Sequence, residues 1–175
     1  MEQLLTATMP LQYVSTRLVR EPTFDDRPIL KDANAVADFL KQRLDLSLDR
    51  EVLGVICLSP RKQVNLAEII SIGTIDGTMM HAREVYKSAI TSSSVAIILF
   101  HTHPTSGIAL PSECDLVATK RMIEAGAILG INFVDHIIIA GNGSWSSIFA
   151  LAGEEDMHTF VKNQLQIMQG ENNAE

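Results

Sequence analysis

The residues best suited to chemistry lie in the segment His101-Thr102-His103-Pro104, which directly follows an apolar run from Val95 to Phe100. Side chains two positions apart on a strand point to the same side, so His101 and His103 can converge on one ion. Neutral imidazole nitrogens are good zinc ligands, and the end of a strand holds them rigidly. Two imidazoles aimed the same way after a buried run are costly without a partner. The pair therefore predicts a metal site.

Asp115 is the predicted third ligand. Hydrolytic zinc sites commonly add a carboxylate and leave the fourth position to water. Asp115 lies three residues after Ser112 at the start of a predicted helix, so both side chains share one face and can point back to the strand end. The same S-x-x-D spacing is typical of a helix capping arrangement. The metal interpretation is preferred because the spacing coincides with the histidine pair.

A hydrolytic zinc site also needs a base that takes a proton from water, and glutamate is the natural candidate. Glu51 opens a predicted strand, Glu68 lies within the next one, and Glu84 lies near a helix start. Glu51 is also explained as a surface carboxylate beside Arg50. Glu84 is also explained as an acid at a helix N-terminus. Spacing alone does not choose among the three glutamates.

The elements that must position these residues follow from apolar periodicity and turn residues. We expect helices over residues 32–44, 82–90, 112–129 and 154–168, with caps at Asp32 and Ser112 and a stop at Gly130. We expect strands over residues 51–58, 64–72, 94–100, 131–140 and 146–151, with a further edge strand over 11–18. The last two of the main strands would form a hairpin around residues 141–143. Helices mixed with hairpins favour a three-layer mixed α/β (α+β) sheet.

Composition narrows the class of protein. The 175 residues suit an N-terminal arm over 1–30, a single main domain over 31–170 and a frayed tail over 171–175. A formal charge of −7 argues against broad binding to nucleic acid. We find no membrane-spanning run and no secretory signal pattern, and we interpret Cys57 and Cys114 as reduced packing residues. A cytoplasmic location is expected.

The ordered set of motifs resembles the JAB/MPN+ (JAMM) metallopeptidases, and most closely their RadC-like branch. The family pattern is a glutamate opening an apolar strand, then H-x-H-P, then S-x-x-D. It is matched by Glu51, by His101-Thr102-His103-Pro104 and by Ser112-Glu113-Cys114-Asp115. RadC-like features also occur at residues 71–74, 81–85 and 130–139, so the similarity runs over about residues 50–150.

The resemblance implies a JAB/MPN-like sheet flanked by helices and a zinc-dependent peptidase or isopeptidase acting on a peptide or protein. One zinc ion per chain would bind His101, His103 and Asp115, with water as the fourth ligand. Glu51 would act as general base and then as acid to the leaving amine. Ser112 would hydrogen-bond the tetrahedral oxyanion.

Departures from the family pattern lie around the second histidine. Eight residues, Pro104 to Pro111, separate His103 from Ser112, one more than is usual in the family. Thr102 and the sequence Thr105-Ser106-Gly107 replace the usual H-N-H-P-S-G sequence, and Ala82 stands where proline is common. The longer loop puts the shape of the substrate cleft in question.

The alternatives to a zinc hydrolase of this family are a non-catalytic binding module and two other classes of metal hydrolase. A RadC-like module that acts in DNA-repair or mobile-element complexes without turnover would not need Glu51. The amidohydrolase H-x-H signature belongs to a barrel of ~250 residues, for which this chain is too short. A zinc deaminase requires H-x-E and P-C-x-x-C motifs, and neither occurs in this sequence. His136 fits either a structural role or a place behind the metal ligands. The structural interpretation is favoured because an isolated histidine is usually structural.

Overall fold

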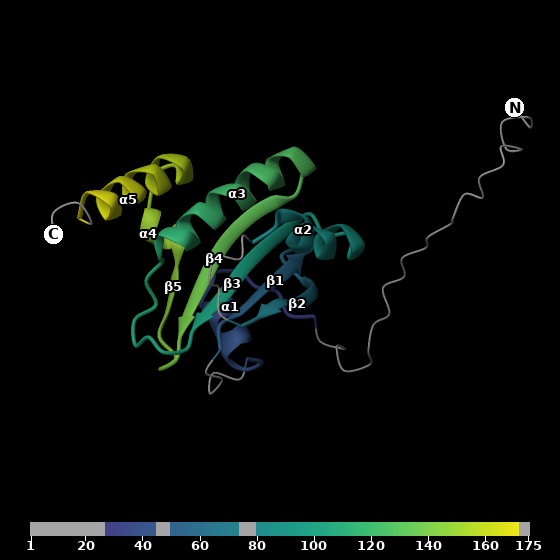
Figure 1. Cartoon of the computed structure of the whole chain (residues 1–175). Coiled ribbons are helices and arrows are strands. Elements are labelled where there is room, and N and C mark those ends of the chain that lie inside the picture. Colours follow the sequence, from purple (N-terminus) through teal and green to yellow (C-terminus); the bar gives the residue numbers. More distant parts are fainter. Residues whose placement is uncertain (1–26, 45–49, 74–79, 172–175) are drawn as a thin grey trace, which may run out of the picture.

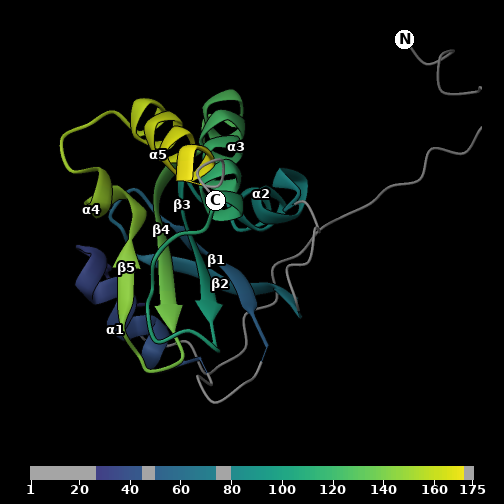
Figure 2. The same ribbon diagram turned by 60° about the vertical axis from the view of Figure 1, so that its left-hand side comes forward.

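The computed structural model describes residues 27–44, 50–73 and 80–171. These residues form a five-stranded sheet in the order β2-β1-β3-β4-β5, with helices packed on both faces (Figures 1 and 2). The elements in chain order are α1 (Ala33–Lys41), β1 (Val52–Leu58), β2 (Val64–Ile72), α2 (Ala82–Thr91), β3 (Ala96–His103), α3 (Glu113–Leu129), β4 (Asn132–Ala140), β5 (Trp145–Ser147), α4 (Ile148–Ala152) and α5 (Met157–Glu171).

The sheet is mixed. β1 pairs antiparallel with both β2 and β3, β3 pairs parallel with β4, and β4 pairs antiparallel with β5. All residues of β1 and all but the last of β3 are buried, as expected for apolar central strands covered on both faces. This arrangement confirms the predicted mixed α/β fold class.

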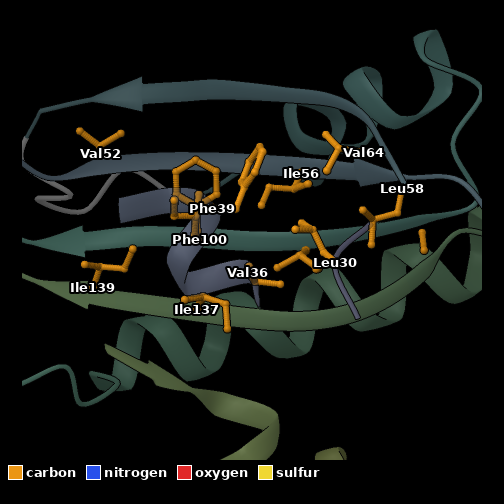
Figure 3. Packing of buried hydrophobic residues seen from close by; sticks show 13 residues of the cluster. Leu30, Val36, Phe39, Val52, Ile56, Leu58, Val64, Phe100, Ile137 and Ile139 are labelled. Atoms are coloured by element: carbon orange, nitrogen blue, oxygen red, sulfur yellow. The ribbon is translucent and has the colours of Figure 1, made fainter. Parts of the chain in front are cut away.

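Helix α1 covers one face of the sheet. Its first turn is capped by Asp32, whose carboxylate accepts a hydrogen bond of 2.9 Å from the backbone N–H of Ala35. Val36 and Phe39 of α1 pack against alternate residues of the central strands, including Ile56 and Phe100 (Figure 3). The first helix therefore packs across the sheet as predicted.

The opposite face of the sheet is covered by α2 and α3. The residues of β1 and β3 that alternate with those of the first cluster, such as Leu53 and Leu99, pack there against Tyr86 of α2 and Met122 of α3. Because side chains alternate along a strand, His101 points to this same face. The histidines of β3 therefore face α3, the helix that begins with the S-x-x-D motif.

Several elements differ from their predicted bounds. Residues 148–151 are helical instead of extended, because Ser147 caps α4 by accepting a hydrogen bond of 2.9 Å from the N–H of Ala150. β3 continues through His103, so both histidines belong to the strand. Helix α1 ends at Lys41, three residues before the predicted end at Leu44. Cys114 is exposed, so its interpretation as a packing residue is wrong, whereas Cys57 is buried.

The ends of the chain lie largely outside the described residues. The predicted edge strand over residues 11–18 lies there, as does most of the predicted arm over 1–30 and the tail from 172. The predicted division into arm, domain and tail stays a prediction. Within the described ranges, no helix combines the length and the apolar character needed to cross a membrane.

Candidate metal centre

The end of β3 and the first turn of α3 bring His101, His103 and Asp115 together. The Nε2 atoms of the two histidines lie 2.8 Å apart. The Nε2 of His101 lies 3.1 Å from Oδ1 of Asp115, and the Nε2 of His103 lies 3.6 Å from Oδ2. One donor atom from each of the three residues lies within 4.8 Å of the other two. His101 and Asp115 are buried and His103 is partly exposed, so the group is open to solvent on one side.

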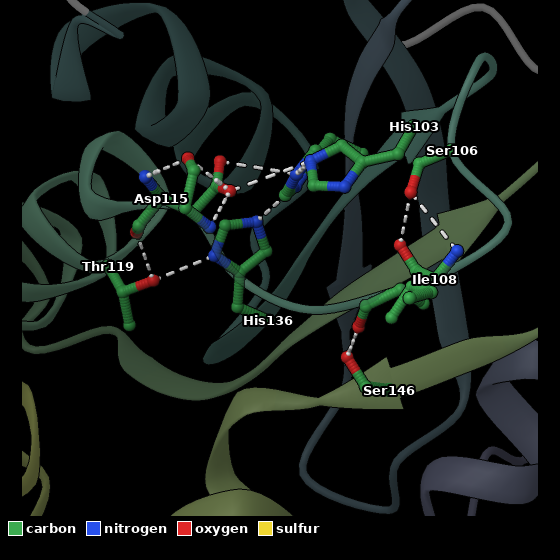
Figure 4. Close-up of polar contacts among 10 residues, drawn as sticks. His103, Ser106, Ile108, Asp115, Thr119, His136 and Ser146 are labelled. Carbon is green, nitrogen blue, oxygen red and sulfur yellow. Dashed lines mark hydrogen bonds and ion pairs between the residues drawn. The ribbon is translucent and has the colours of Figure 1, made fainter. Parts of the chain in front are cut away.

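Ser112 and Asp115 form a capping box at the start of α3. The Ser112 hydroxyl accepts a hydrogen bond from the Asp115 N–H at 3.2 Å and donates one to Oδ2 of Asp115 at 2.6 Å. The Ser112 N–H donates to the same Oδ2 at 2.7 Å. Capping therefore occupies Oδ2 and orients the carboxylate, while Oδ1 faces His101 (Figure 4). The capping and metal interpretations are compatible, because they use different oxygens.

The electrostatics of the group favour a charged carboxylate beside a protonated imidazole. Burial alone would raise the pKa of Asp115, but hydrogen bonds from His101, His103 and Ser112 outweigh it and hold this pKa far below its usual range. Hydrogen bonding to Asp115 raises the pKa of His103 against the lowering effect of burial, and the negative charges of Asp115 and Glu51 add to the increase. A cation is thus favoured where the ring of His103 meets Asp115.

Glu51 lies immediately before β1, near the histidine pair. Leu53 pairs with His101 in the antiparallel register of β1 and β3, and the charge of Glu51, two residues before Leu53, acts on the ring of His103. The buried hydroxyl of Thr102, between the two histidines, accepts a hydrogen bond of 2.9 Å from the N–H of Val52. This bond ties the start of β1 to the end of β3, and with it the position of Glu51.

The other two candidate bases are engaged elsewhere. Glu68 accepts a hydrogen bond of 2.5 Å from the hydroxyl of Ser88 on α2. Glu84 is exposed and forms an ion pair of 3.2 Å with its neighbour Arg83. Of the three glutamates, Glu51 is the one whose charge acts on His103, and its role as the base stays a prediction.

The long loop between His103 and α3 is held against the turn between β4 and β5. The Asn142 side chain donates a hydrogen bond of 2.9 Å to the carbonyl of Gly107. The Ser146 hydroxyl, labelled in Figure 4, donates to the carbonyl of Ala109. Gly141 donates its N–H to the carbonyl of His103 at 3.0 Å. The extra residue is accommodated in a loop with defined contacts, which leaves Ile108 exposed.

His136 and Thr119 lie directly behind the three candidate ligands. Nε2 of His136 is 2.8 Å from Nδ1 of His101, and Nδ1 of His136 is 2.7 Å from the Thr119 hydroxyl. Burial, and after it the neighbouring His101, lowers the pKa of His136 well below the ordinary value. The location of His136 makes the isolated structural interpretation of this residue incomplete.

The sequence carried only a faint signal for these two residues. Thr119 follows Asp115 by four positions, which places both on one face of α3. His136 pairs with Leu99 only because an irregularity between Phe133 and Asp135 shifts the register of β4. An apolar pattern does not reveal such a shift.

The donor set fits a divalent metal ion. Two imidazole nitrogens and one carboxylate oxygen are a common ligand set of catalytic zinc sites. The three donors converge from one strand end and one helix start, and the partly exposed side of the group leaves room for a further ligand. A fully closed, four-ligand structural site is not what these residues form.

The mixed sheet and its candidate metal centre define a JAB-type domain. The family model described as the RadC-like JAB domain matches residues 30–155, and the chain belongs to this family.

The chain is also similar to several curated relatives, each named "UPF0758 protein". It is 50% identical over 95 residues to the protein from Desulforamulus reducens, covering 54% of this chain and 41% of the relative. It is 39% identical over 122 residues to that from Moorella thermoacetica, covering 70% and 52%. It is 39% identical over 126 residues to that from Methanococcoides burtonii, covering 72% and 54%. The chain spans about half the length of these relatives.

Proposed function

We propose that this chain is a zinc-dependent hydrolase that cleaves peptide or isopeptide bonds. The observation that carries the proposal is the convergence of His101, His103 and Asp115, with Glu51 near enough to His103 for its charge to act on that ring. Membership of the RadC-like JAB family agrees with it, because the JAB/MPN+ pattern combines these residue types in this order.

The chemistry divides among the residues by their positions. A bound zinc ion supplies Lewis acidity and lowers the pKa of a water molecule to about 7. Glu51 is not one of the three donors, and its charge acts on the ring of His103, so its carboxylate is the proposed acceptor of the proton. The same carboxyl group then delivers this proton to the leaving amine. His101 and Asp115 are buried and hold the geometry.

Ser112 is proposed to stabilise the oxyanion that develops on the substrate carbonyl. Ser112 is an exposed residue, and in the structure its hydroxyl donates to Oδ2 of Asp115. Donation to substrate therefore requires the hydroxyl to turn. The Ser112 N–H continues to hold Oδ2 at 2.7 Å while it does so.

The exposed loop before α3 is the surface that a substrate chain would meet first. Ile108 and Leu110 expose 63% and 58% of their surface, while Ala109 between them is buried. This alternation leaves two apolar side chains exposed in the loop that follows the partly exposed His103. Such a surface suits an apolar stretch of peptide or protein better than a charged nucleic acid, in agreement with the net charge of −7.

The experiment is hydrolysis of a panel of peptide and isopeptide-linked substrates by wild type and Glu51→Gln. The variant should keep zinc and fold, because the change is nearly isosteric and Glu51 is not a ligand. Its rate should fall by about 10²–10⁴-fold, the usual contribution of a positioned base. Glu84→Gln, which alters a glutamate paired with Arg83, is the matched control and should keep the wild-type rate.

Equal cleavage by wild type and Glu51→Gln would contradict the mechanism. A zinc-loaded wild type that cleaves nothing in the panel would favour the alternative of a non-catalytic module in DNA-repair or mobile-element complexes.

A further inference from the structure

A continuous chain of buried hydrogen bonds runs from the backbone of α3 to the first metal-ligand candidate. The Thr119 hydroxyl lies 2.7 Å from the carbonyl oxygen of Asp115 and 2.7 Å from Nδ1 of His136. Nε2 of His136 lies 2.8 Å from Nδ1 of His101. His101, Thr119 and His136 are each completely buried, so water does not take part.

The direction of every bond in this chain follows from its first acceptor. A carbonyl oxygen only accepts, so the Thr119 hydroxyl donates its one proton to Asp115, and the hydroxyl oxygen must accept from His136. His136 therefore carries its proton on Nδ1. Because Nδ1–H of His136 is used for Thr119, the Nε2 of its uncharged ring accepts a hydrogen bond from Nδ1–H of His101.

The chain thus fixes the tautomer of His101. With the proton on Nδ1, the Nε2 that faces His103 and Asp115 is the nitrogen left to bind a metal ion. The opposite tautomer would place an N–H among the donors and block coordination. Since metal-binding histidines commonly donate their other N–H to a partner that fixes tautomer and ring orientation, the arrangement is well suited to a ligand.

We propose that Thr119 and His136 are positioning residues that hold His101 in the tautomer able to bind the metal ion. The inference rests on the metal site of the proposed function and adds a role for residues outside the ligand set. An apolar pair of similar volume would fill the same space between α3 and β4. Thr119 and His136 instead form three hydrogen bonds, from Thr119 to Asp115, from His136 to Thr119 and from His101 to His136. Together these bonds keep the proton of His101 on Nδ1.

The first test compares Thr119→Val with Thr119→Ser in the full chain by zinc competition against a chromophoric chelator. Valine keeps the volume and loses the hydroxyl, whereas serine keeps the hydroxyl and loses a methyl group. Zinc affinity should fall by about 10–100-fold in Thr119→Val, the usual effect of losing a partner behind a ligand, and Thr119→Ser should restore most of it. A role in packing alone predicts the opposite order. Equal affinity of the valine variant and wild type would overturn the inference.

The second test needs no variant. In the metal-stripped wild type, ¹⁵N-resolved spectra of the histidine side chains should show a proton on Nδ1 of both His101 and His136, and none on Nε2 of His136. A proton on Nε2 of His136 would overturn the inference, whether or not the valine variant folds. Failure of wild type to bind zinc would instead contradict the proposed function, and the tautomers would still be read from the same spectra.

Discussion

At the scale of single residues, the capping serine is the clearest case of one side chain serving two purposes. Ser112 closes the first turn of α3 and also holds the carboxylate of Asp115. The sequence presented capping and metal binding as alternatives for the S-x-x-D motif. The structure shows that one carboxylate oxygen serves the cap and the other faces His101.

Ser112→Ala should separate these purposes. Loss of the cap should lower the free energy of unfolding by about 1 kcal/mol. Hydrolysis should slow by about 10²–10³-fold, as for removal of one oxyanion donor. Zinc should be retained, because the Ser112 N–H still holds Oδ2 of Asp115. Ser112→Thr keeps a capping hydroxyl and is the control for stability. An alanine variant with the wild-type rate would rule out the oxyanion role.

The pH dependence of the protein follows from His103 and Asp115. The pKa of His103 is raised above 6.5, so its stabilising contribution is complete below pH 6.5 and is lost as pH rises through the raised value. The pKa of Asp115 is lowered from 3.8, so its contribution is complete above pH 3.8 and is lost only in stronger acid. Together they stabilise the metal-stripped protein most between pH 3.8 and 6.5.

Metal-stripped protein should therefore lose stability as pH rises above 6.5, while zinc affinity increases over the same range because zinc and a proton compete for His103. Denaturant unfolding and zinc competition, both measured across this range, check the two trends. His103→Gln should flatten the stability trend, and His81→Gln, at an exposed histidine, should leave it unchanged. Zinc affinity independent of pH would contradict this assignment.

At the scale of elements, most of the sheet was predictable from composition and alternation. The apolar runs of β1 and β3 and the cap and stop of α3 are visible in the sequence, and the structure places them as expected. The strand predicted to continue to residue 151 is wrong, because residues after β5 form helix α4. The start of this helix is held by Asp135, whose carboxylate accepts hydrogen bonds from the Ser147 hydroxyl and from the N–H of Phe149. Asp135 belongs to β4, twelve residues before Ser147, so the sequence pattern around residues 146–151 does not reveal this interaction.

In the site, too, the residues that follow local sequence periodicity were predictable, and those that depend on contacts between elements were not. His101, His103 and Asp115 were found because strand and helix periodicity place them on one face. Thr119 and His136 were not assigned, because their roles depend on a register shift in β4 and on contact between β4 and α3. Such long-range contacts are set by packing of the whole sheet.

The hydrogen bond from the Val52 N–H to the Thr102 hydroxyl, which joins β1 to β3, gives a prediction about how these strands position Glu51. Thr102→Val should leave the buried N–H of Val52 without its acceptor, at a cost of about 1–3 kcal/mol in unfolding free energy. Hydrolysis should fall more than zinc affinity, because the bond fixes Glu51 and not the ligands. Thr102→Ser keeps the hydroxyl and should recover most of the rate. Unchanged stability and rate in the valine variant would show that this bond does not position Glu51.

At the scale of the whole molecule, the fold brings together residues far apart in the sequence. Glu51, the histidine pair and Asp115 come from β1, β3 and α3, and a helix on each face of the sheet fixes their relative positions (Figure 1). All of them lie within residues 30–155, the region that matches the RadC-like JAB domain. Metal binding is therefore expected of this chain by itself, although it spans about half the length of its relatives.

The most direct test of the metal centre is the zinc content of the purified chain, measured by elemental analysis. Wild type should hold about one zinc ion per chain, as expected for a single three-ligand site. His103→Ala and Asp115→Ala should each lose most of it, while His81→Ala, at an exposed histidine, should keep it. Full zinc retention in both ligand variants would contradict the assignment of these residues as the metal centre.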